Sequence, residues 1–309
     1  MEYAAYRFKF DTPVHFGERT LTSREMTFSA DRLFSALCME AVKESENTLN
    51  EFLTLANENK LLFSDAFPYA GDDYFFPKPI FSVKRKNKDE DIKARKKFKK
   101  IKYLKIDKFK GYLAGEESAE NLKLPEFGRD SVKTSVNVEH TVDPKPYRVG
   151  LFTFNENCGL YIIVGYEEES KTLIKNLFED LLDRLTFSGI GGKRSAGLGR
   201  FELLPGKIDD ETKTRLTGNF NTYMTLSISL PTDEELSNAL EGATYLLQKK
   251  GGFVASVDYA DEWRKKRDAF AFAAGSCFHN KFNGRIMNVG DNGNHPVYRF
   301  LKPMFLGVN

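Results

Sequence analysis

The segment 189–199 constrains the fold most, because it holds five glycines in eleven residues and joins a helix to a strand. The helix is predicted over 171–187, where leucines recur at every fourth position, and the strand over 200–204. P-loops and dinucleotide-binding loops instead follow a strand and open a helix. Their residue patterns are also absent. In a P-loop the lysine is followed by Ser or Thr, but Lys193 is followed by Arg194. In the dinucleotide pattern G-x-G-x-x-G, counted from Gly189, the last glycine is replaced by the same Arg194. Neither kind of nucleotide-binding loop is therefore predicted.

A glycine-rich turn of this kind can bring the backbone close to a ligand. Glycine adopts positive φ without steric cost, and consecutive N–H groups in such a turn can form a nest that binds anions. Two cations and a hydroxyl, from Lys193, Arg194 and Ser195, lie among the glycines. This combination predicts a phosphate cradle built from Gly191, Gly192 and these three residues. The alternative is a tight connection in which the small residues serve packing alone.

The order of predicted elements repeats along the chain. The first half carries a strand at 6–10, an amphipathic helix at 30–44, short strands within 61–81, a buried strand at 160–164, and then the helix and strand around the glycines. After Pro205 and Gly206 come a strand at 222–230, a helix at 232–248 and a strand at 252–258. This order predicts an α+β fold of two ferredoxin-like (RRM-like) modules, over residues 1–206 and 207–309.

Two insertions interrupt the first module. Alternating residues at 132–142 and 147–154 flank the proline-rich turn 143–146, which predicts a long β-hairpin over 136–154. The segment 84–110 holds fourteen Lys and Arg against four acids, and a short helix and a strand are predicted within it. A block this basic either forms a solvated face or contacts an anionic partner such as RNA.

Composition excludes several classes of protein. The formal net charge is +2, so no whole-molecule field favours nucleic acid, and most of the 27 phenylalanines are expected in the core. No apolar run reaches the roughly 18 residues of a membrane span, and the N-terminus lacks the pattern of a secretory signal. The three cysteines, Cys38, Cys158 and Cys277, lie far apart. We therefore expect a cytoplasmic protein with reduced thiols and no membrane contact.

No catalytic residue, metal site or cofactor is predicted. The four histidines and three cysteines show no ligand spacing. His15 is the candidate general base, since it could lie close to the glycines. Asp31 follows the predicted cap Ser29 in the first turn of a helix, where an interaction with the helix dipole explains an acid. The Ala-Gly-Asp-Asp segment at 70–73 is predicted to be an ordinary turn.

Several blocks of the sequence resemble a known family. The pattern G-φ-G-x5-G-x-G, where φ is apolar, is similar to the signature of the RAMP superfamily of CRISPR RNA-binding proteins, which lies between the last helix and last strand of a ferredoxin-like module. Four further blocks resemble the fourth subunit of type III-A Csm complexes: V-H-F-G-E (14–18), S-A-D-R-L-F-S-A-L-C (29–38), P-Y-R-V-G (146–150) and H-P-V-Y-R-F-L-K-P-M-F (295–305). The resemblance spans nearly the whole chain.

This resemblance implies a non-catalytic subunit that binds the 5′ handle of the crRNA, caps the backbone of the complex and helps self/non-self discrimination in antiviral defence. Its partners would be the crRNA, the large signature subunit, the adjacent backbone RAMP subunit and, through the guide duplex, target RNA. The alternative is a metal-independent RAMP endoribonuclease that processes precursor crRNA with His15 as its base. A scaffold without RNA contact is a weaker third possibility.

The resemblance also implies which residues meet the RNA. The loop from Gly191 to Ser195 would contact handle phosphates. Residues 143–148, including Lys145, Tyr147 and Arg148, would form the tip of a thumb that displaces one nucleotide of the guide–target duplex. Three residues would lie near the same RNA path: His15, Phe16 and Arg24. RNA recognition combines backbone contacts with stacking on aromatic or guanidinium planes, and suitable groups are offered by Phe16, Tyr147, Arg148, Tyr298 and Arg299.

Overall fold

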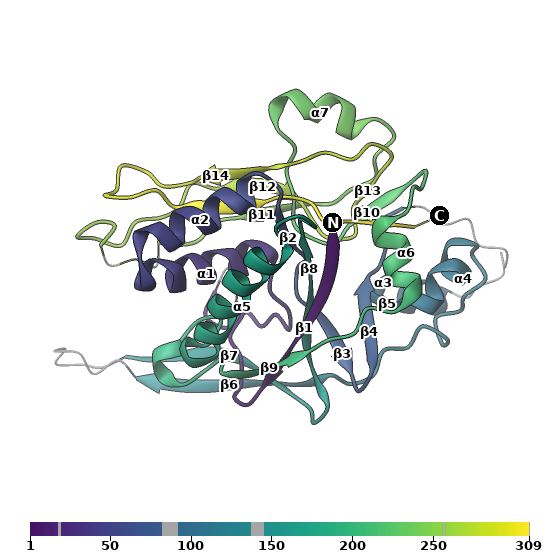
Figure 1. The fold of residues 1–309 in the computed structure, drawn as a ribbon. Helices are drawn as coiled ribbons and strands as arrows, with labels where there is room; N and C mark the ends of the chain where they lie inside the picture. The colour runs from purple at the N-terminus through teal and green to yellow at the C-terminus, as the bar shows by residue number, and fades with distance from the viewer. Residues whose placement is uncertain (18–19, 82–91, 137–144, 255, 257, 309) are drawn as a thin grey trace.

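A computed structural model of the chain describes residues 1–309 except 18–19, 82–91, 137–144, 255, 257 and 309 (Figure 1). Its largest sheet is antiparallel throughout. The strands follow one another across the sheet in the order β5 (Tyr103–Lys105), β4 (Asp73–Pro77), β3 (Phe67–Ala70), β8 (Cys158–Tyr166), β1 (Glu2–Phe10) and β9 (Phe201–Pro205), and β2 (Leu61–Phe63) also pairs with β8. The strand β9, which follows the glycine segment, therefore forms one edge, and β5 forms the other.

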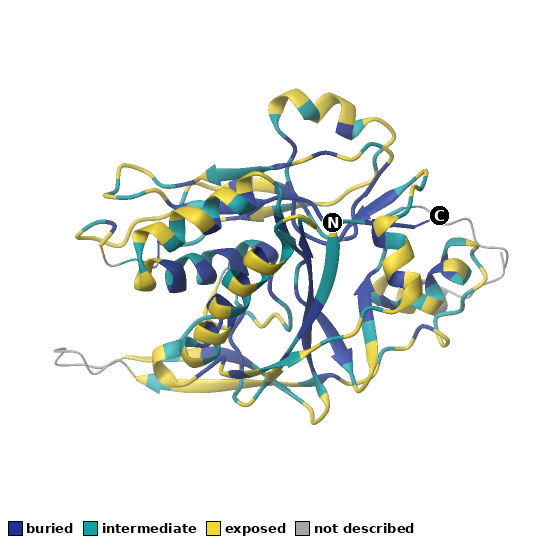
Figure 2. Ribbon diagram, viewed as in Figure 1, coloured by how far each residue is buried: buried dark blue, intermediate teal, exposed yellow. Residues whose placement is uncertain are grey.

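Both faces of this sheet are buried. Along β8, Leu160 and Ile162 point into one core while Tyr161 and Ile163 point into another, as the alternation of a strand requires. The first core is closed by helices α1 (Ala30–Glu44), α2 (Glu46–Asn57) and α5 (Lys171–Ser188). The second is closed by the C-terminal half together with α3 (Ile92–Lys100) and α4 (Phe109–Leu113) (Figures 1 and 2).

The predicted helices of the first half are confirmed. The helix predicted over 30–44 is α1, and the one predicted over 171–187 is α5. Ser29 occupies the N-cap position of α1, but its side chain makes no capping bond. The leucine repeat does not point wholly inward, because Leu173 is exposed while Leu181 and Leu185 are buried.

The helix α2 was not predicted. Ser45 ends α1 and begins α2, and its hydroxyl accepts a hydrogen bond from the backbone N–H of Thr48. The helix buries Phe52 and Ala56, and its three leucines pack partly buried against the same core, so it is amphipathic and its pattern was overlooked in the sequence. The segment 70–73 forms the predicted turn, which connects β3 to β4 with Gly71 at φ +60°.

The hairpin prediction is confirmed for the described residues: the first strand begins at Gly128, earlier than the predicted 132, and residues 137–142 of the predicted strand lie outside the described residues. Strands β6 (Gly128–Val136) and β7 (Pro146–Phe154) pair without interruption from Gly128 opposite Phe154 to Val136 opposite Pro146. Of the predicted tip 143–148, residues 143 and 144 lie outside the described residues. The predicted helix and strand within 84–110 correspond to α3 and β5, followed by a short 3-10 turn (Ile106–Lys108) and α4.

The C-terminal half is built from short pieces. A three-stranded sheet is formed by β13 (Cys277–Phe278), β10 (Tyr223–Thr225) and β16 (Phe305–Gly307). Two hairpins lie beside it, β11 (Leu247–Lys250) with β12 (Ala269–Phe272) and β14 (Arg285–Asn288) with β15 (Tyr298–Leu301). Its helices are α6 (Asp210–Thr217), which was not predicted, and α7 (Asp233–Leu240).

Three predicted boundaries in this half were wrong. The helix predicted over 232–248 begins with a capping box at Thr232 and Glu235 but ends at Leu240, because Gly242 adopts positive φ and the chain then enters β11. The strand predicted over 222–230 is limited to β10 and one isolated bridge at Ser229. The described part of the strand predicted over 252–258 makes a single bridge, from Phe253 to Lys265.

Buried polar contacts join the two halves. The Asp65 carboxylate accepts hydrogen bonds from the backbone N–H groups of Ala30 (2.8 Å) and Ile228 (3.1 Å), one from each half. Burial raises the pKa of this carboxyl to about 6, although both bonds and Lys250 act in the opposite direction. The predicted module boundary at residue 206 follows directly after β9.

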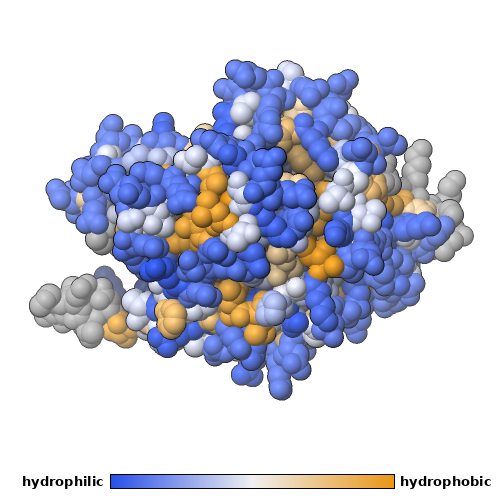
Figure 3. All heavy atoms as spheres, viewed as in Figure 1, coloured by the Kyte–Doolittle hydropathy of each residue, from blue (hydrophilic) through white to orange (hydrophobic). Residues whose placement is uncertain are grey.

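The described residues contain no membrane-spanning helix and no disulfide bond. Within the described residues, no helix is both long and apolar enough to cross a membrane. Cys38, Cys158 and Cys277 are all unpaired thiols. On the face drawn in Figure 3, hydrophobic residues form separate patches among hydrophilic ones.

Candidate nucleic-acid interface

The glycine loop, residues 189–199, holds a conformation that requires glycine. Gly191, Gly197 and Gly199 have positive φ, and Lys193 adopts the left-handed conformation at φ +59°. The loop closes on itself through a hydrogen bond from the N–H of Ile190 to the carbonyl of Gly199 (2.9 Å). A Cβ at Gly199 would lie 2.1 Å from the Ile190 oxygen, so no larger residue fits there. The loop is therefore a rigid, closed turn.

The loop rests on the segment 13–16. The N–H groups of Gly199 and Gly192 donate to the carbonyls of Pro13 (3.0 Å) and His15 (2.9 Å). A Cβ at Gly192 would lie 2.7 Å from the His15 ring. These two glycines therefore serve packing, and the Gly192 amide, which was expected to bind an anion, is used inside the protein.

The remaining amides and the cations face outward from the tip of the loop. The backbone N–H groups of Lys193, Arg194 and Ser195 donate to no other described residue of the chain. Ser195 is exposed, and the two cations are half-buried. Three consecutive donors beside two cations are the arrangement that a phosphate oxygen requires.

The turn end of the hairpin, where β7 begins, meets the glycine loop. The Lys193 amine donates to the Tyr147 hydroxyl (3.3 Å) and lies 4.7 Å from the centre of its ring. Beneath this contact, Leu198 of the loop packs with Val149 and Leu151 of β7. Two regions that the sequence presented as separate candidates therefore form one continuous surface.

His15 holds the hairpin and the loop together. Its Nδ1–H donates to the carbonyl of Gly150 (2.8 Å), and the residue is 8% exposed. Its neighbour Val14 exchanges backbone hydrogen bonds with Phe152 of β7 at 2.8 and 3.0 Å. The geometry gives His15 a positioning role beneath the glycine loop.

The structure places the other predicted residues differently. Arg24 is exposed, and its side chain crosses Gly150, where a Cβ would lie 2.5 Å from the arginine Cγ. Lys145 and Arg148 are exposed at the start of β7. Side chains alternate along β7, so Arg148 and the Arg24 contact at Gly150 lie on the face opposite Tyr147, Val149 and Leu151, which pack toward the glycine loop.

Two expected stacking groups are corrected. Phe16 is 1% exposed and packs edge-on against Phe10 and Phe28 in the core, so its ring is not available to a base. Arg299 is 3% exposed, and its guanidinium donates to the Asp31 carboxylate (2.7 Å). Asp31 also accepts from the N–H of Phe300 (3.0 Å), so this acid joins the two halves.

Sequence reasoning missed Arg32. Its guanidinium donates to the carbonyl of Gly17 (3.1 Å) and lies 5.8 Å from the centre of the Phe16 ring. Arg32 thereby fixes the segment that supports the glycine loop. The contact depends on how the N-terminus of α1 packs against residues 15–17, and no spacing in the sequence could have shown it.

The basic block lies far from this surface. Its strand β5 forms the sheet edge opposite β9, and Figure 1 shows α3 and α4 at the other end of the molecule from β6 and β7. Within its described part, Lys97 pairs with Glu120 (2.9 Å) and Lys105 pairs with Asp73 (2.5 Å). The glycine loop and the basic block cannot form one small patch.

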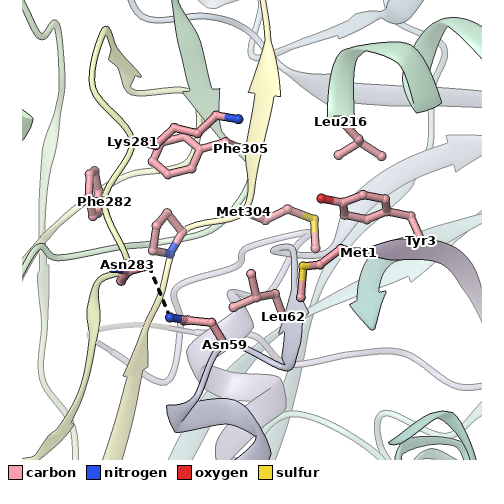
Figure 4. Close-up of a pocket in the computed structure, with 11 residues that line it drawn as sticks. Met1, Tyr3, Asn59, Leu62, Leu216, Lys281, Phe282, Asn283, Met304 and Phe305 are labelled. Carbon is pink, nitrogen blue, oxygen red and sulfur yellow. Dashed lines mark hydrogen bonds between the residues drawn. The ribbon is translucent and has the colours of Figure 1, made fainter. Parts of the chain in front are cut away.

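A pocket of about 280 Å³ lies between the two halves (Figure 4). Met1, Tyr3 and Asn59 line one side and Asn283 and Phe305 the other, with a hydrogen bond of 3.4 Å between the two asparagines. None of the predicted site residues lines it. Among the described residues, no group of three or more His, Cys, Asp and Glu side chains could hold a metal ion.

Two family models match the chain. Residues 7–202 match the RAMP superfamily, and residues 219–308 match the CRISPR Csm4 C-terminal domain. The chain is 37% identical over 314 residues to the CRISPR system Cms protein Csm4 of Mycobacterium tuberculosis (strain ATCC 25618 / H37Rv), covering 100% of this chain and 98% of that protein. It is 36% identical over 315 residues to the protein of the same name from Streptococcus thermophilus, covering 99% and 98%.

Solved structures share the fold. A chain in the crystal structure of the Csm3-Csm4 subcomplex of the type III-A CRISPR-Cas interference complex superposes with a TM-score of 0.69 at 20% identity, and both chains are covered completely. A chain in the crystal structure of the Csm1-Csm4 cassette with cA4 gives a TM-score of 0.64 at 19% identity, covering 99% of this chain and 98% of that one. At these identities the likeness concerns the fold alone.

Proposed function

The chain belongs to the Csm4 family of the RAMP superfamily, and from this premise we propose that it is a non-catalytic subunit of a type III CRISPR effector complex that binds the 5′ handle of the crRNA. Such an assembly works in the cytoplasm, and its role is antiviral defence. The subunit would cap the backbone of the complex at the end where the handle leaves the guide.

One observation carries this proposal. The glycine loop, the segment 13–17 and the start of β7 converge on a single surface, where Lys193 touches Tyr147. The open amides of residues 193–195 can hold a phosphate, and the Tyr147 ring lies within reach of a neighbouring base. Backbone contact plus stacking is how proteins recognise single-stranded RNA.

The hairpin supplies the second part of the proposal. Strands β6 and β7 form a long hairpin, and Tyr147, which contacts the glycine loop, belongs to its predicted thumb tip at residues 143–148. We assign the hairpin to the guide–target duplex beside the handle, where it displaces one nucleotide and so contributes to self/non-self discrimination.

The proposed protein partners follow from the family. The similar structures are those of a Csm3-Csm4 subcomplex and a Csm1-Csm4 cassette. For this chain we propose the corresponding backbone RAMP subunit and large signature subunit as neighbours, with target RNA reached through the guide duplex.

An endoribonuclease is the competing function, and the position of His15 is what favours it. The imidazole lies directly beneath Gly192, close enough to an RNA on the loop to serve as a base. Against it, Nδ1 is engaged with Gly150 and the ring is nearly buried. The positioning role therefore explains His15 better.

The test uses the purified chain and labelled repeat RNA without metal. We expect binding without cleavage, and weaker binding for Lys193→Ala/Arg194→Ala. A matched control, Lys171→Ala/Arg184→Ala, removes the same charges from α5, where both residues form ion pairs. Cleavage that disappears in His15→Ala would replace the proposal by the endoribonuclease. Equal loss of binding in the control would show that the loop is not the site.

A further inference from the structure

An arm projects from the C-terminal half between β11 and β12. Its two described sides are residues 252–254 and 263–267, which we call the Trp263 arm. They are held together by hydrogen bonds from the N–H of Val254 to the carbonyl of Arg264 (2.9 Å) and from the N–H of Lys266 to the carbonyl of Gly252 (2.8 Å). The arm is thus an ordered antiparallel pair outside the named strands.

The arm displays two aromatic rings to solvent. Trp263 is 84% exposed and Phe253 is 58% exposed, and their ring centres lie 6.1 Å apart at an angle of 78°. Exposed aromatic rings of this size are costly to leave in water, because each could bury a large apolar area. Because the rings are nearly perpendicular, each keeps its own exposed surface that a flat partner can cover.

Charges of both signs flank the Trp263 ring: the exposed acids Asp261 and Glu262 precede it, and four cations follow it. The sequence from 263 onward is Trp-Arg-Lys-Lys-Arg, and Arg264, Lys265 and Arg267 are exposed. Asp268 offsets part of this charge, since its carboxylate lies 2.8 Å from the Lys249 amine and 3.7 Å from that of Lys265. Aromatic rings interleaved with cations are the composition of surfaces that bind single-stranded nucleic acid.

The root of the arm carries excess positive charge. Burial lowers the pKa of the Lys266 amine, and the nearby Asp31 carboxylate raises it. The Arg299 and Arg32 guanidiniums lower this pKa further, because like charges repel. The Nε of Arg299 is buried without a hydrogen-bond partner. One carboxylate faces three cations here, and an anion at this place would relieve their repulsion.

A chain of contacts links this root to the glycine loop. Arg299 donates to the carbonyl of Gly251 (3.4 Å) at the base of the arm and to Asp31 (2.7 Å) on α1. Arg32, next to Asp31, donates to Gly17, two residues beyond the carbonyl on which the loop rests. The arm and the loop are therefore connected through contacts at the N-terminus of α1.

We infer that the Trp263 arm is a second contact for single-stranded RNA, in which Trp263 and Phe253 stack on bases while Arg264 and Lys265 hold the adjacent phosphates. This inference rests on the proposed function, because it extends the path of the same RNA from the glycine loop across Arg32 to the arm. It names a contact in the C-terminal half, whereas the glycine loop, the segment 13–17 and the hairpin belong to the first half.

RNA explains the arm better than a protein partner does. A protein interface favours an apolar centre with charges at its rim. Here two exposed aromatic residues lie on one narrow arm among charged residues of both signs, and the root of the arm adds the cations Arg299 and Arg32. Stacking needs only a ring face and tolerates any base sequence.

The single tryptophan of the chain makes the test direct. Titration of the full chain with single-stranded repeat RNA should quench the Trp263 emission over the same concentrations that raise the anisotropy of labelled RNA. Trp263→Ala should weaken binding roughly five- to tenfold or more, and Trp263→Phe should retain most of the affinity because it keeps a ring. Leu173→Ala, at another exposed apolar residue, serves as the matched control.

The possible failures can be told apart. RNA that binds through Lys193 and Arg194 while Trp263 emission and Trp263→Ala affinity stay unchanged would overturn the arm and leave the proposed function standing. Absence of any RNA binding would overturn both. A Trp263→Ala variant that binds RNA normally but loses a protein subunit of the complex would overturn the RNA contact and identify the arm as a protein interface.

Discussion

The two edges of the main sheet carry two different kinds of basic surface. At the β9 edge the glycine loop presents two cations, Lys193 and Arg194. Strand β5 at the other edge belongs to the basic block 84–110, whose sequence holds fourteen Lys and Arg residues. The loop is fixed by backbone hydrogen bonds to Pro13 and His15 and by the buried side chain of Ile190. The described lysines of the block are mostly exposed, and several pair with nearby acids.

This difference teaches that charge number alone does not locate a phosphate site. A lysine on an exposed helix is a flexible point charge, whose ordering on binding costs entropy. The loop instead holds its amides and cations in place before any ligand arrives, so less is lost on binding. We expect the loop to determine which RNA segment binds and the block to add affinity for RNA of any sequence.

The largest expected effect is on the loop backbone. Gly199→Ala places a Cβ 2.1 Å from the Ile190 oxygen at a residue with positive φ, and it should lower the free energy of unfolding by about 3 kcal/mol. Gly197→Ala has the same backbone strain but open space, and it should cost only about 1 kcal/mol. Urea denaturation of both variants measures the difference, and equal costs would show that the closed loop is not a rigid element.

A smaller effect is expected at Tyr147, at the start of β7. Tyr147→Ala removes the ring from Lys193 and from the Leu198 cluster, and it should cost about 1 kcal/mol and weaken RNA binding severalfold. Tyr147→Phe keeps the ring and should behave nearly like the parent. If both variants bind RNA as the parent does, the hairpin does not organise the loop. For the same reason, deletion of residues 143–148 would disturb the loop as well as the hairpin.

The smallest effect is expected in the basic block. Lys97 lowers the pKa of Glu120, so any stabilisation by this pair is present at neutral pH and disappears as the pH falls through the lowered pKa. Both side chains are exposed, and solvent and salt screen the pair. Glu120→Gln should therefore leave the urea midpoint unchanged at every pH. A clear shift would mean that the block is as firmly fixed as the loop.

The sequence predicted the first half well, because its signals are local. The helices α1 and α5 have strong apolar periodicity, and the hairpin follows from alternation on both sides of a proline-rich turn. The glycine pattern identified the loop and its position between helix and strand. In the second half, short strands and a helix stopped by Gly242 depend on tertiary pairing, so windowed patterns overestimated their lengths.

The candidate site was predicted less completely. The sequence selected Lys193, Tyr147 and His15 separately, but their contacts depend on how the loop, hairpin and segment 13–17 pack. It could not distinguish a buried ring from an exposed one, so Phe16 was expected to stack although it lies in the core. The sequence also offered no reason to select Trp263, because a single tryptophan in a polar segment can be buried or exposed. Only its exposure in the structure identified it as a candidate contact.

The salt dependence of RNA binding tests the central claim most directly. Affinity for handle and scrambled RNA should be measured over a range of salt for the parent, for Lys193→Ala/Arg194→Ala and for Lys96→Ala/Lys99→Ala in the block. We expect the loop variant to lose handle affinity selectively and to lower the slope of log affinity against log salt by about 0.7 for each lost phosphate contact. The block variant should weaken binding of both RNAs equally. Selective loss of handle binding in the block variant, with an unchanged slope in the loop variant, would contradict the account.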